Sequence, residues 1–335
     1  MTNEALIIQF ASGPEYRPDC LKLEPCEVPR PGEGEVLLRP LLLSIDPTNH
    51  NWLKLQPQSN PFGLEVGSAM KGPCVAEIVE SRTDRFAAGQ KVTAMAGWER
   101  LSVVPGHLVQ PLIEGVPLEA HLTIFSHVGL AAATGLIEVG RVQEDDVVVV
   151  SAAAGATGSV AVEMAVAYGA RVIGIAGGAE KCRFVVEELG AEACIDYRAE
   201  DVEAELGRLC PAGVTLFFDN VGGAVLDAVL MNMALNSRIV VCGQIALYNS
   251  VDRNDGQGVR NLMELVFRRI RMQGFIAGEP HERLPEYIGE LKRLFDAGKI
   301  NSRVHIVQRL EKAPQAIELL FAGKNTGKVI VEAEK

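Results

Sequence analysis

The strongest chemical signal in this sequence is a glycine-containing segment, SAAAGATGSVAVEMA, at residues 151–165. Ala153, Gly155 and Gly158 occupy the three positions of a GxGxxG dinucleotide fingerprint, with Ala replacing the first glycine. Gly155 would let the backbone approach a pyrophosphate, and Gly158 would let the next helix pack closely on the sheet. That helix would offer unpaired N–H groups and a positive dipole end to the phosphates. The alternative interpretation is a tight glycine turn of any α/β protein.

The end of the following predicted strand indicates which dinucleotide would bind. NAD enzymes normally place an Asp or Glu there, which accepts from the adenosine ribose 2′-OH. Here the chain has Ala176, Gly177 and Gly178, with no acid. Lys181 could pair with a 2′-phosphate, and Tyr197 at the end of the third strand could donate its hydroxyl. A solvated lysine and a strand-capping tyrosine are the alternatives, but the missing acid favours NADPH.

The elements that must position these residues alternate regularly from residue 147 to 245. Apolar runs predict strands over 147–152, 171–177, 193–197, 214–220 and 238–245. Helical spacing lies between them, over 159–169, 180–190, 202–209 and 224–233. A helix rich in Ala and Leu is expected just before them, over 124–139. Such repeated strand–helix units predict a doubly wound parallel sheet covered by helices on both faces.

The two ends of the chain have a different pattern. Strands at 34–46, 74–81 and 91–98, separated by Gly and Pro, favour a small β-barrel or sandwich domain. Residues 249–260 are expected to be a loop, followed by a helix–strand pair over 261–276 and an amphipathic helix over 285–298. Two tail strands, 304–310 and 328–334, flank a helix at 313–323 and are predicted to rejoin the β domain. The predicted boundaries are therefore 1–124, 125–299 and 300–335.

Composition excludes several classes of function. The 335 residues carry 32 Lys+Arg against 43 Asp+Glu, a net charge of −11, which argues against nucleic acid as the main partner. The 48% of hydrophobic residues predict a globular protein, and no stretch is apolar enough for a membrane span. Seven cysteines without a CxxC motif fit no zinc cluster and favour buried thiols in a reducing compartment. No secretory signal precedes the domain, so we expect a cytoplasmic protein.

With these motifs in view, the sequence resembles the zinc-independent prostaglandin reductase and leukotriene dehydrogenase branch of the medium-chain dehydrogenase/reductase superfamily. That branch also contains alkenal double-bond reductases and a curcumin-reducing member. The resemblance covers nearly the whole chain, through segments such as PRPGEGEVLLRPLLLSIDP, VGSAMKGPCVAEIVES, SAAAGATGSV, FFDNVGG, RIVVCGQIALYN and GKNTGKVIV. It implies an α/β fold in which a GroES-like β-barrel substrate domain is joined to a Rossmann NADPH-binding domain, with the tail returning to the first.

The resemblance also implies cofactor contacts at the matching positions. Gly155, Ala156, Thr157, Gly158 and Ser159 would line the pyrophosphate. The other implied contacts are Lys181 and Tyr197 at the 2′-phosphate, Asn220 near the ribose, Cys242, Gly243, Gln244 and Tyr248 beside the nicotinamide, Phe275, Ile276 and Ala277 after the sixth strand, and Asn325 from the tail. Turn chemistry beside glycine would explain Asn220 and Asn325 equally well.

The zinc-dependent relatives hold their metal with a Cys and a His in the first domain. At the corresponding places this chain has SIDPTNH and VGSAMKG, so we expect no metal. The branch instead implies hydride transfer from NADPH to the β-carbon of an α,β-unsaturated ketone or aldehyde. The resulting enolate needs a hydrogen-bond donor and a proton. Tyr248 is the candidate catalytic side chain, while the cofactor's ribose hydroxyl or water could serve instead.

Two departures from the branch lie near the expected substrate pocket, for which we select Thr48, His50 and Trp52. The usual Tyr-Met-Arg is replaced by Thr48-Asn49-His50, and a Thr-Ala-Tyr stretch by Ala131–Ala133. We therefore hypothesise a substrate pocket that is roomier or differently shaped. A quinone reductase and a non-catalytic NADPH-binding protein remain alternatives, and the resemblance implies a homodimer.

Overall fold

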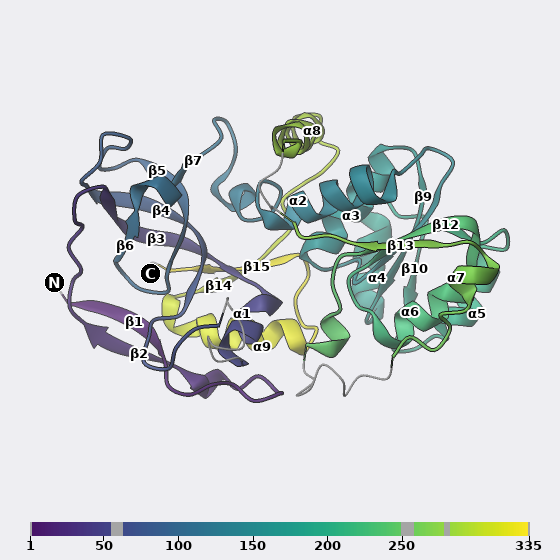
Figure 1. The fold of residues 1–335 in the computed structure, drawn as a ribbon, viewed down its shortest axis with the longest axis horizontal. Coiled ribbons are helices and arrows are strands. Elements are labelled where there is room, and N and C mark those ends of the chain that lie inside the picture. The colour runs from purple at the N-terminus through teal and green to yellow at the C-terminus, as the bar shows by residue number, and fades with distance from the viewer. Residues whose placement is uncertain (1, 55–62, 249–257, 278–281, 334–335) are drawn as a thin grey trace. The chain divides into compact units, whose positions relative to one another are not determined.

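The computed structural model describes residues 2–54, 63–248, 258–277 and 282–333. The chain forms two compact units (Figure 1). One unit comprises Met1–Leu122 together with Val304–Lys335, and the other is Thr123–Arg303. We call the first the β unit and the second the α/β unit.

Six parallel strands form the sheet of the α/β unit, in the order β10-β9-β8-β11-β12-β13. Their bounds are β8 Val147–Ser151, β9 Arg171–Ala176, β10 Ala193–Asp196, β11 Val214–Asp219, β12 Met233–Val241 and β13 Arg271–Gly274. In chain order this is 3-2-1-4-5-6, the order of a dinucleotide-binding doubly wound sheet. The predicted fold class is confirmed. The strand order reverses between β8 and β11, so their carboxyl ends flank the switch point.

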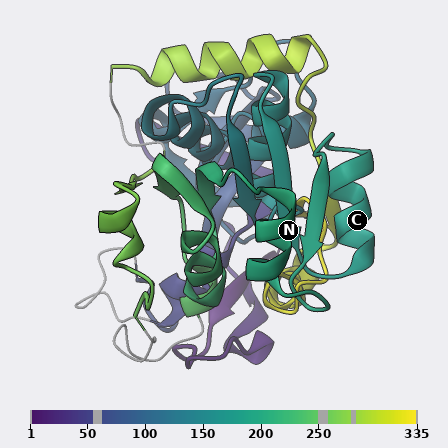
Figure 2. The same ribbon diagram turned by 90° about the vertical axis from the view of Figure 1, so that its right-hand side faces the viewer.

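Helices cover both faces of this sheet (Figure 2). Alternate strand residues point to opposite faces: Val148 and Val150 lie in one apolar core, and Val149 lies in the other. The first core is closed by α2 (His127–Ala133), α3 (Ala156–Ala167), α4 (Ala179–Glu187) and α8 (Leu284–Asp296). The second is closed by α5 (Val202–Leu209) and α6 (Gly223–Leu230), and the short α7 (Glu264–Phe267) precedes β13.

The single helix predicted over 124–139 is wrong in detail. Ser126 accepts a hydrogen bond from the Val128 N–H, so α2 begins at His127. From Thr134 to Gly140 the chain continues as a π-helix, which ends at Arg141 with a φ of 50°. An i→i+5 turn has nearly the same apolar spacing as an α-helix, so the sequence pattern did not separate the two.

The β unit holds a seven-stranded sheet in the order β14-β15-β3-β4-β5-β7, with β6 also paired to β3. Its strands are β3 Glu35–Ile45, β4 Lys71–Ser81, β5 Lys91–Gly97, β6 Ser102–Pro105, β7 Gln110–Pro111, β14 Val304–Gln308 and β15 Lys328–Glu332. β15 runs antiparallel to β3 with Val329 opposite Ile45, which joins the tail to this sheet. A separate hairpin pairs β1 (Asn3–Ile8) with β2 (Leu21–Cys26).

In the described part of the β unit, the helices α1 (Pro47–Lys54) and α9 (Ala313–Phe321) accompany the sheets. Neither α1 nor the β1–β2 hairpin was predicted from the sequence. Short 3-10 turns occur at Pro18–Cys20, Gly106–Leu108, Leu118–His121, Ile245–Leu247 and Leu310–Lys312. Most of the loop predicted over 249–260 lies outside the described residues. Within the described ranges, every helix is too short or too polar to cross a membrane.

Candidate functional site

The turn between β8 and α3 has the geometry of a phosphate-binding loop. After Ser151 the chain turns sharply at Ala152, whose φ is +48°, and the Ala153 N–H donates to the Ile175 oxygen at 3.1 Å. α3 then begins at Ala156, and its N-cap residue, Gly155, provides no side-chain cap. The first N–H groups of the helix therefore stay available for an anion.

Glycine is required in this turn for steric reasons. A Cβ added to Gly158 would lie 2.2 Å from the Ala152 oxygen and 3.0 Å from the Ala153 Cα. At Gly155 the nearest atom would be the Ala152 oxygen at 3.1 Å. Ala153 replaces the first glycine of the fingerprint without a clash because its neighbour Gly174 on β9 has no side chain; a Cβ there would lie 3.0 Å from that of Ala153.

The carboxyl ends of β9 and β10 meet beside the start of α4. Gly178, with a φ of +99°, donates its N–H to the Asp196 carboxylate at 2.8 Å. Asp196 also accepts from the Arg198 N–H at 3.0 Å, so this acid closes the turn. A Cβ added to Gly177 would lie 2.9 Å from both the Tyr197 hydroxyl oxygen and the Arg198 Nε. Both side chains therefore fold over Gly177.

Two cations lie close together at this edge, and in the described part of the chain neither has a carboxylate counter-ion. Burial, and then the charge of Arg198, lower the pKa of Lys181. The Arg198 guanidinium stands 5.9 Å from the Tyr197 ring and makes no ion pair with any carboxylate of the described residues. Like charges that repel one another favour a bound anion. Arg198 was not among the predicted site residues, although its position directly after Tyr197 was a usable signal.

The ends of β11, β12 and β13 complete the same edge of the sheet. Asn220 follows β11, and Cys242–Tyr248 follow β12 through the 3-10 turn Ile245–Leu247. A Cβ added to Gly243 would lie 3.5 Å from the Tyr248 hydroxyl oxygen, and burial raises the pKa of Tyr248. Gln244 is half-buried beside them. Phe275–Ala277 follow β13; Phe275 packs against the core, whereas Ile276 is 68% exposed.

The remaining predicted site residues belong to the β unit. Asn325 is buried and donates from Nδ2 to the Gly327 oxygen at 3.0 Å. On α1, Thr48 is exposed and Trp52 is half-buried against the core. His50 is fully buried, which favours a packing role over direct contact with a ligand.

The surroundings of His50 explain its electrostatics. Its Nε2 lies 3.0 Å from the Ser12 hydroxyl and 3.2 Å from the Gly13 oxygen. The rings of Tyr16 and Phe321 stand edge-on, with centroids at 5.4 and 5.1 Å. Burial lowers the pKa of His50 to about 4. His50 is therefore neutral at physiological pH.

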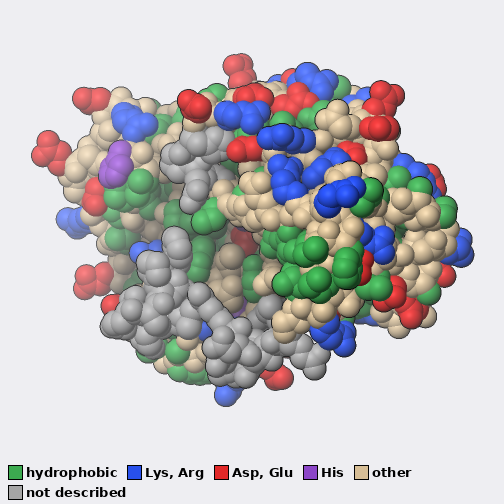
Figure 3. Space-filling view, turned by 45° about the vertical axis from the view of Figure 1, so that its right-hand side comes forward, with side chains coloured by type: hydrophobic (Ala, Val, Ile, Leu, Met, Phe, Trp, Pro, Cys, Tyr) green, Lys and Arg blue, Asp and Glu red, His purple; other side chains and the backbone are tan. Residues whose placement is uncertain are grey.

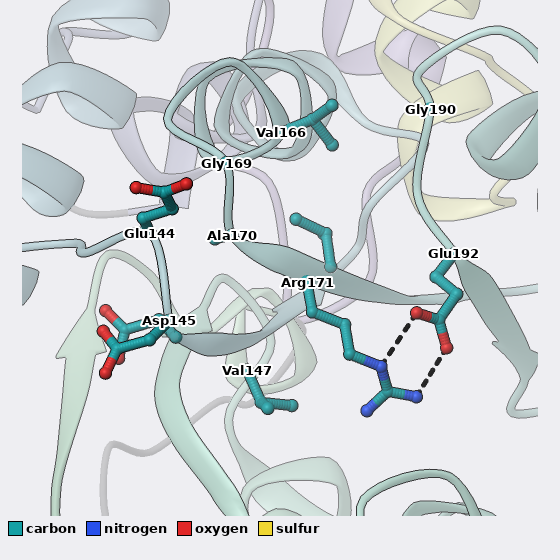
Figure 4. A pocket seen from close by; sticks show the side chains of 11 residues that line it. Glu144, Asp145, Val147, Val166, Gly169, Ala170, Arg171, Gly190 and Glu192 are labelled. Carbon is teal, nitrogen blue, oxygen red and sulfur yellow. Dashed lines mark hydrogen bonds and ion pairs between the residues drawn. The ribbon is translucent and has the colours of Figure 1, made fainter.

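Two surface hollows lie in the α/β unit. Figure 4 shows one at the amino ends of β8 and β9, where Arg171 donates to Glu192 at 2.6 and 2.8 Å near Glu144 and Asp145. This hollow is at the edge of the sheet opposite the phosphate-binding turn. The other lies beside α4 and includes Cys182, Cys194 and Asp196. Across the described ranges, no three His, Cys, Asp or Glu side chains gather as metal ligands.

A 3-2-1-4-5-6 parallel sheet with such a turn, joined in the chain to a β unit, has the architecture of a two-domain, dinucleotide-binding protein. Two family profiles match the chain: an N-terminal domain of oxidoreductase over residues 8–112, and a zinc-binding dehydrogenase domain over 156–293. The chain belongs to the medium-chain dehydrogenase/reductase superfamily, in the zinc-independent branch that contains curcumin, alkenal and prostaglandin reductases.

Individual relatives are similar to this chain over most of their length. The NADPH-dependent curcumin reductase of Escherichia coli is 35% identical over 94% of this chain and 92% of its own. The 2-alkenal reductase (NADP(+)-dependent) of Nicotiana tabacum is 35% identical over 90% and 88%. The structure of CurA in complex with NADPH from Vibrio vulnificus aligns with a TM-score of 0.92 and 33% identity, over 99% of both chains. The chain is an NADP-dependent oxidoreductase.

Proposed function

We propose that this protein uses NADPH to reduce the C=C bond of α,β-unsaturated ketones and aldehydes. The observation that carries this proposal is full-length similarity to relatives named for such acceptors, the curcumin, 2-alkenal and prostaglandin reductases. A carbonyl conjugated to the double bond already makes the β-carbon electrophilic, so the reaction needs no further electrophile.

The residues at the carboxyl edge of the α/β sheet fit NADPH. The N–H groups at the start of α3, from Ala156 to Ser159, would bind the pyrophosphate. Lys181, Tyr197 and Arg198 would bind the 2′-phosphate, since Tyr197 and Arg198 lie over Gly177 and the charge of Arg198 acts on Lys181. The ribose and nicotinamide end of the cofactor would contact the remaining predicted residues, Asn220, Cys242, Gly243, Gln244, Tyr248, Phe275, Ile276, Ala277 and Asn325.

Bound NADPH supplies the hydride, and the protein must manage the charge and the proton that follow. Hydride addition at the β-carbon leaves an enolate, whose oxygen needs a donor and whose α-carbon needs a proton. Burial raises the pKa of Tyr248, so its hydroxyl stays protonated at neutral pH and can donate. Thr48 and Trp52 of α1 would shape the substrate pocket, and buried His50 would support that helix from its core side.

Cofactor absorbance tests the proposal directly. Purified protein is mixed with NADPH and a panel of short alkenals, bulky aryl enones and quinones. We expect NADPH consumption with the enones and a product reduced at the C=C bond, identified by mass spectrometry and NMR. Consumption with quinones alone would reassign the protein as a quinone reductase. Tight NADPH binding without turnover across the panel would make it a non-catalytic binder.

Cofactor choice has its own test. Lys181→Ala and Arg198→Ala should each raise KM for NADPH about tenfold or more, as expected for loss of a charge-assisted contact, and leave KM for NADH nearly unchanged. Lys292→Ala is the matched control, because Lys292 pairs with Asp296 on the outer face of α8. Equal effects of Lys181→Ala on both cofactors would refute the 2′-phosphate assignment.

We also propose that the protein is a homodimer formed through the β13 edge of the α/β sheet. Figure 3 shows apolar side chains gathered on one face, and Leu262, Met263, Val266, Phe267 and Ile276 are 50–68% exposed around α7 and β13. A contiguous exposed apolar surface beside an end strand favours a second copy as its partner. Phe267→Glu should yield monomers in sedimentation velocity, whereas Leu108→Glu, at an apolar position of the β unit that is 56% exposed, should not. The seven free cysteines favour a cytoplasmic location.

A further inference from the structure

Asp219, the last residue of β11, carries a carboxylate in an unusual environment. Its side chain is completely buried, and no Lys, Arg or His of the described residues pairs with it. A buried charge without a counter-ion is costly unless hydrogen bonds satisfy it. The donors that surround Asp219 therefore indicate what the residue does.

Three donors converge on one carboxylate oxygen. Oδ1 accepts from the Ser151 hydroxyl and the Val221 N–H, both at 2.9 Å, and from the Gly222 N–H at 3.0 Å. Gly222 also reaches Oδ2 at 3.2 Å and has a φ of +70°. Burial raises the pKa of Asp219, and these N–H groups oppose that rise. The carboxylate thus folds the chain after β11 into a tight turn and ties it to the end of β8.

The backbone of the same residue holds a second segment. The Asp219 carbonyl oxygen accepts from the N–H groups of Cys242 at 2.8 Å and Gly243 at 3.1 Å. The next two carbonyls continue the contact: Asn220 accepts from Ile245 N–H, and Val221 from Ala246 N–H, both at 3.2 Å. The turn after β11 and the segment after β12 therefore form one hydrogen-bonded unit.

This unit also orients the Asn220 amide. The Asn220 N–H donates to the Ser151 hydroxyl at 2.8 Å, and its Nδ2 donates to the Ser151 carbonyl at 2.7 Å. The amide oxygen has no partner in the described chain and is left as a free acceptor. The Ser151 hydroxyl accepts from the backbone N–H of Asn220 while it donates to Asp219, so the carboxylate fixes the Asn220 backbone, and with it the start of the side chain, through one hydroxyl.

We propose that Asp219 is a positioning residue that holds Asn220 and Cys242–Gly243 in the geometry that binds the nicotinamide end of NADPH. It acts through the Ser151 hydroxyl and the backbone of the turn after β11, and not by contact with the cofactor. The inference rests on the cofactor assignment made under the proposed function, but not on the identity of the reduced substrate. Asp219 should therefore matter for the nicotinamide end of the cofactor and not for its adenosine end.

Ligand binding without an enone tests this. Dissociation constants are measured for NADPH, by fluorescence, and for adenosine 2′,5′-bisphosphate, by calorimetry. The latter lacks the nicotinamide half. The variants are Asp219→Asn, Asp219→Ala and Ser151→Ala. Asp227→Asn is the matched control, because Asp227 is also a buried carboxylate of the α/β unit but is paired with Arg260.

We expect Asp219→Ala to raise the Kd for NADPH at least tenfold, while the Kd for adenosine 2′,5′-bisphosphate stays within about twofold, because a lost buried contact acts locally. Asp219→Asn should raise this Kd less than Asp219→Ala, because its amide oxygen can keep the three donors of Oδ1. Its amide nitrogen would face the Gly222 N–H in place of Oδ2, so some loss remains. Ser151→Ala removes the hydroxyl that donates to Asp219 and keeps the carboxylate. It should therefore also raise the Kd for NADPH and leave the Kd for adenosine 2′,5′-bisphosphate nearly unchanged. Equal losses for both ligands, or none for either, would overturn the proposal. A wild-type protein that reduces no enone would refute the proposed substrate and leave this test intact.

Discussion

Replacing Gly158 by Ala tests the close approach of α3 to the turn after β8. The added Cβ would lie 2.2 Å from the Ala152 oxygen, 1.2 Å inside the 3.4 Å at which ordinary contact begins. The next two neighbours are also backbone atoms, at 2.9 and 3.0 Å, so no side chain can rotate away. Overpacking of this kind costs up to about 3 kcal/mol, and alanine's helix propensity returns about 1 kcal/mol. We expect a net loss of about 2 kcal/mol.

The same displacement would move the N–H groups at the start of α3 away from the pyrophosphate. Loss of one hydrogen bond to a charged group costs about 1.5–3 kcal/mol, which corresponds to a Kd raised about 10- to 100-fold. NADPH titration by fluorescence measures this, and calorimetry should show a Tm lower by about 4–8 °C.

Gly289→Ala is the matched control for Gly158→Ala. Gly289 lies in α8 with no atom within 4 Å of an added Cβ. Alanine there should raise stability by up to about 1 kcal/mol and leave the Kd unchanged. Wild-type affinity and Tm in Gly158→Ala would refute the reasoning, because they would show that helix and turn are not in close contact.

Three further outcomes follow from particular contacts. The pKa of His50 is about 4 in the folded chain and about 6.5 in the unfolded chain. As pH drops, the unfolded chain therefore binds a proton at His50 before the folded chain does. The free energy of unfolding should fall by up to about 3 kcal/mol between these two pH values. Urea unfolding between about pH 4 and 7 should show a shallower decline in His50→Gln, and an unchanged decline would contradict this assignment. Gly177→Ala should displace the Tyr197 ring and raise the Kd for NADPH about tenfold at little cost in stability. The Kd for NADH should stay unchanged, and a parallel rise for both cofactors would count against this prediction. Lys328→Met removes the Lys328 counter-ion of the buried Asp46 carboxylate, which still accepts from the Ser44 hydroxyl. The variant should cost about 3–5 kcal/mol in chemical denaturation, and the added Asp46→Asn change should restore most of that loss. A loss below about 1 kcal/mol would show that the pair is unimportant.

The alternating strands and helices were predictable because each strand of a covered parallel sheet is apolar on both faces. The predicted strand at 171–177 corresponds to β9, and the predicted helix at 202–209 corresponds to α5. Predictions failed where the local pattern is ambiguous. The β1–β2 hairpin mixes polar and apolar residues without a tight-turn motif. The segment that forms α1, from Pro47, was considered for its resemblance to the family and not for helical spacing.

The candidate site was predictable only in part. Glycines such as Gly158 have a spacing that a close backbone approach demands, so the phosphate-binding turn was visible in the sequence. Arg198 and Asp219 were not selected, because their roles depend on neighbours from other strands. Asp219 depends on Ser151, which is 68 residues earlier in the chain.

The sequence by itself determined the fold class, the phosphate-binding turn and the lack of an acid after β9, because these depend on periodicity and on spacing within one short segment. Only the tertiary structure decided that His50 is buried and neutral, that Lys181 and Arg198 share one edge, and that Asp219 joins two loops. These properties arise from burial and from distances between segments that are far apart in the chain. Local sequence does not encode such distances; the packing of the sheet and its helices sets them.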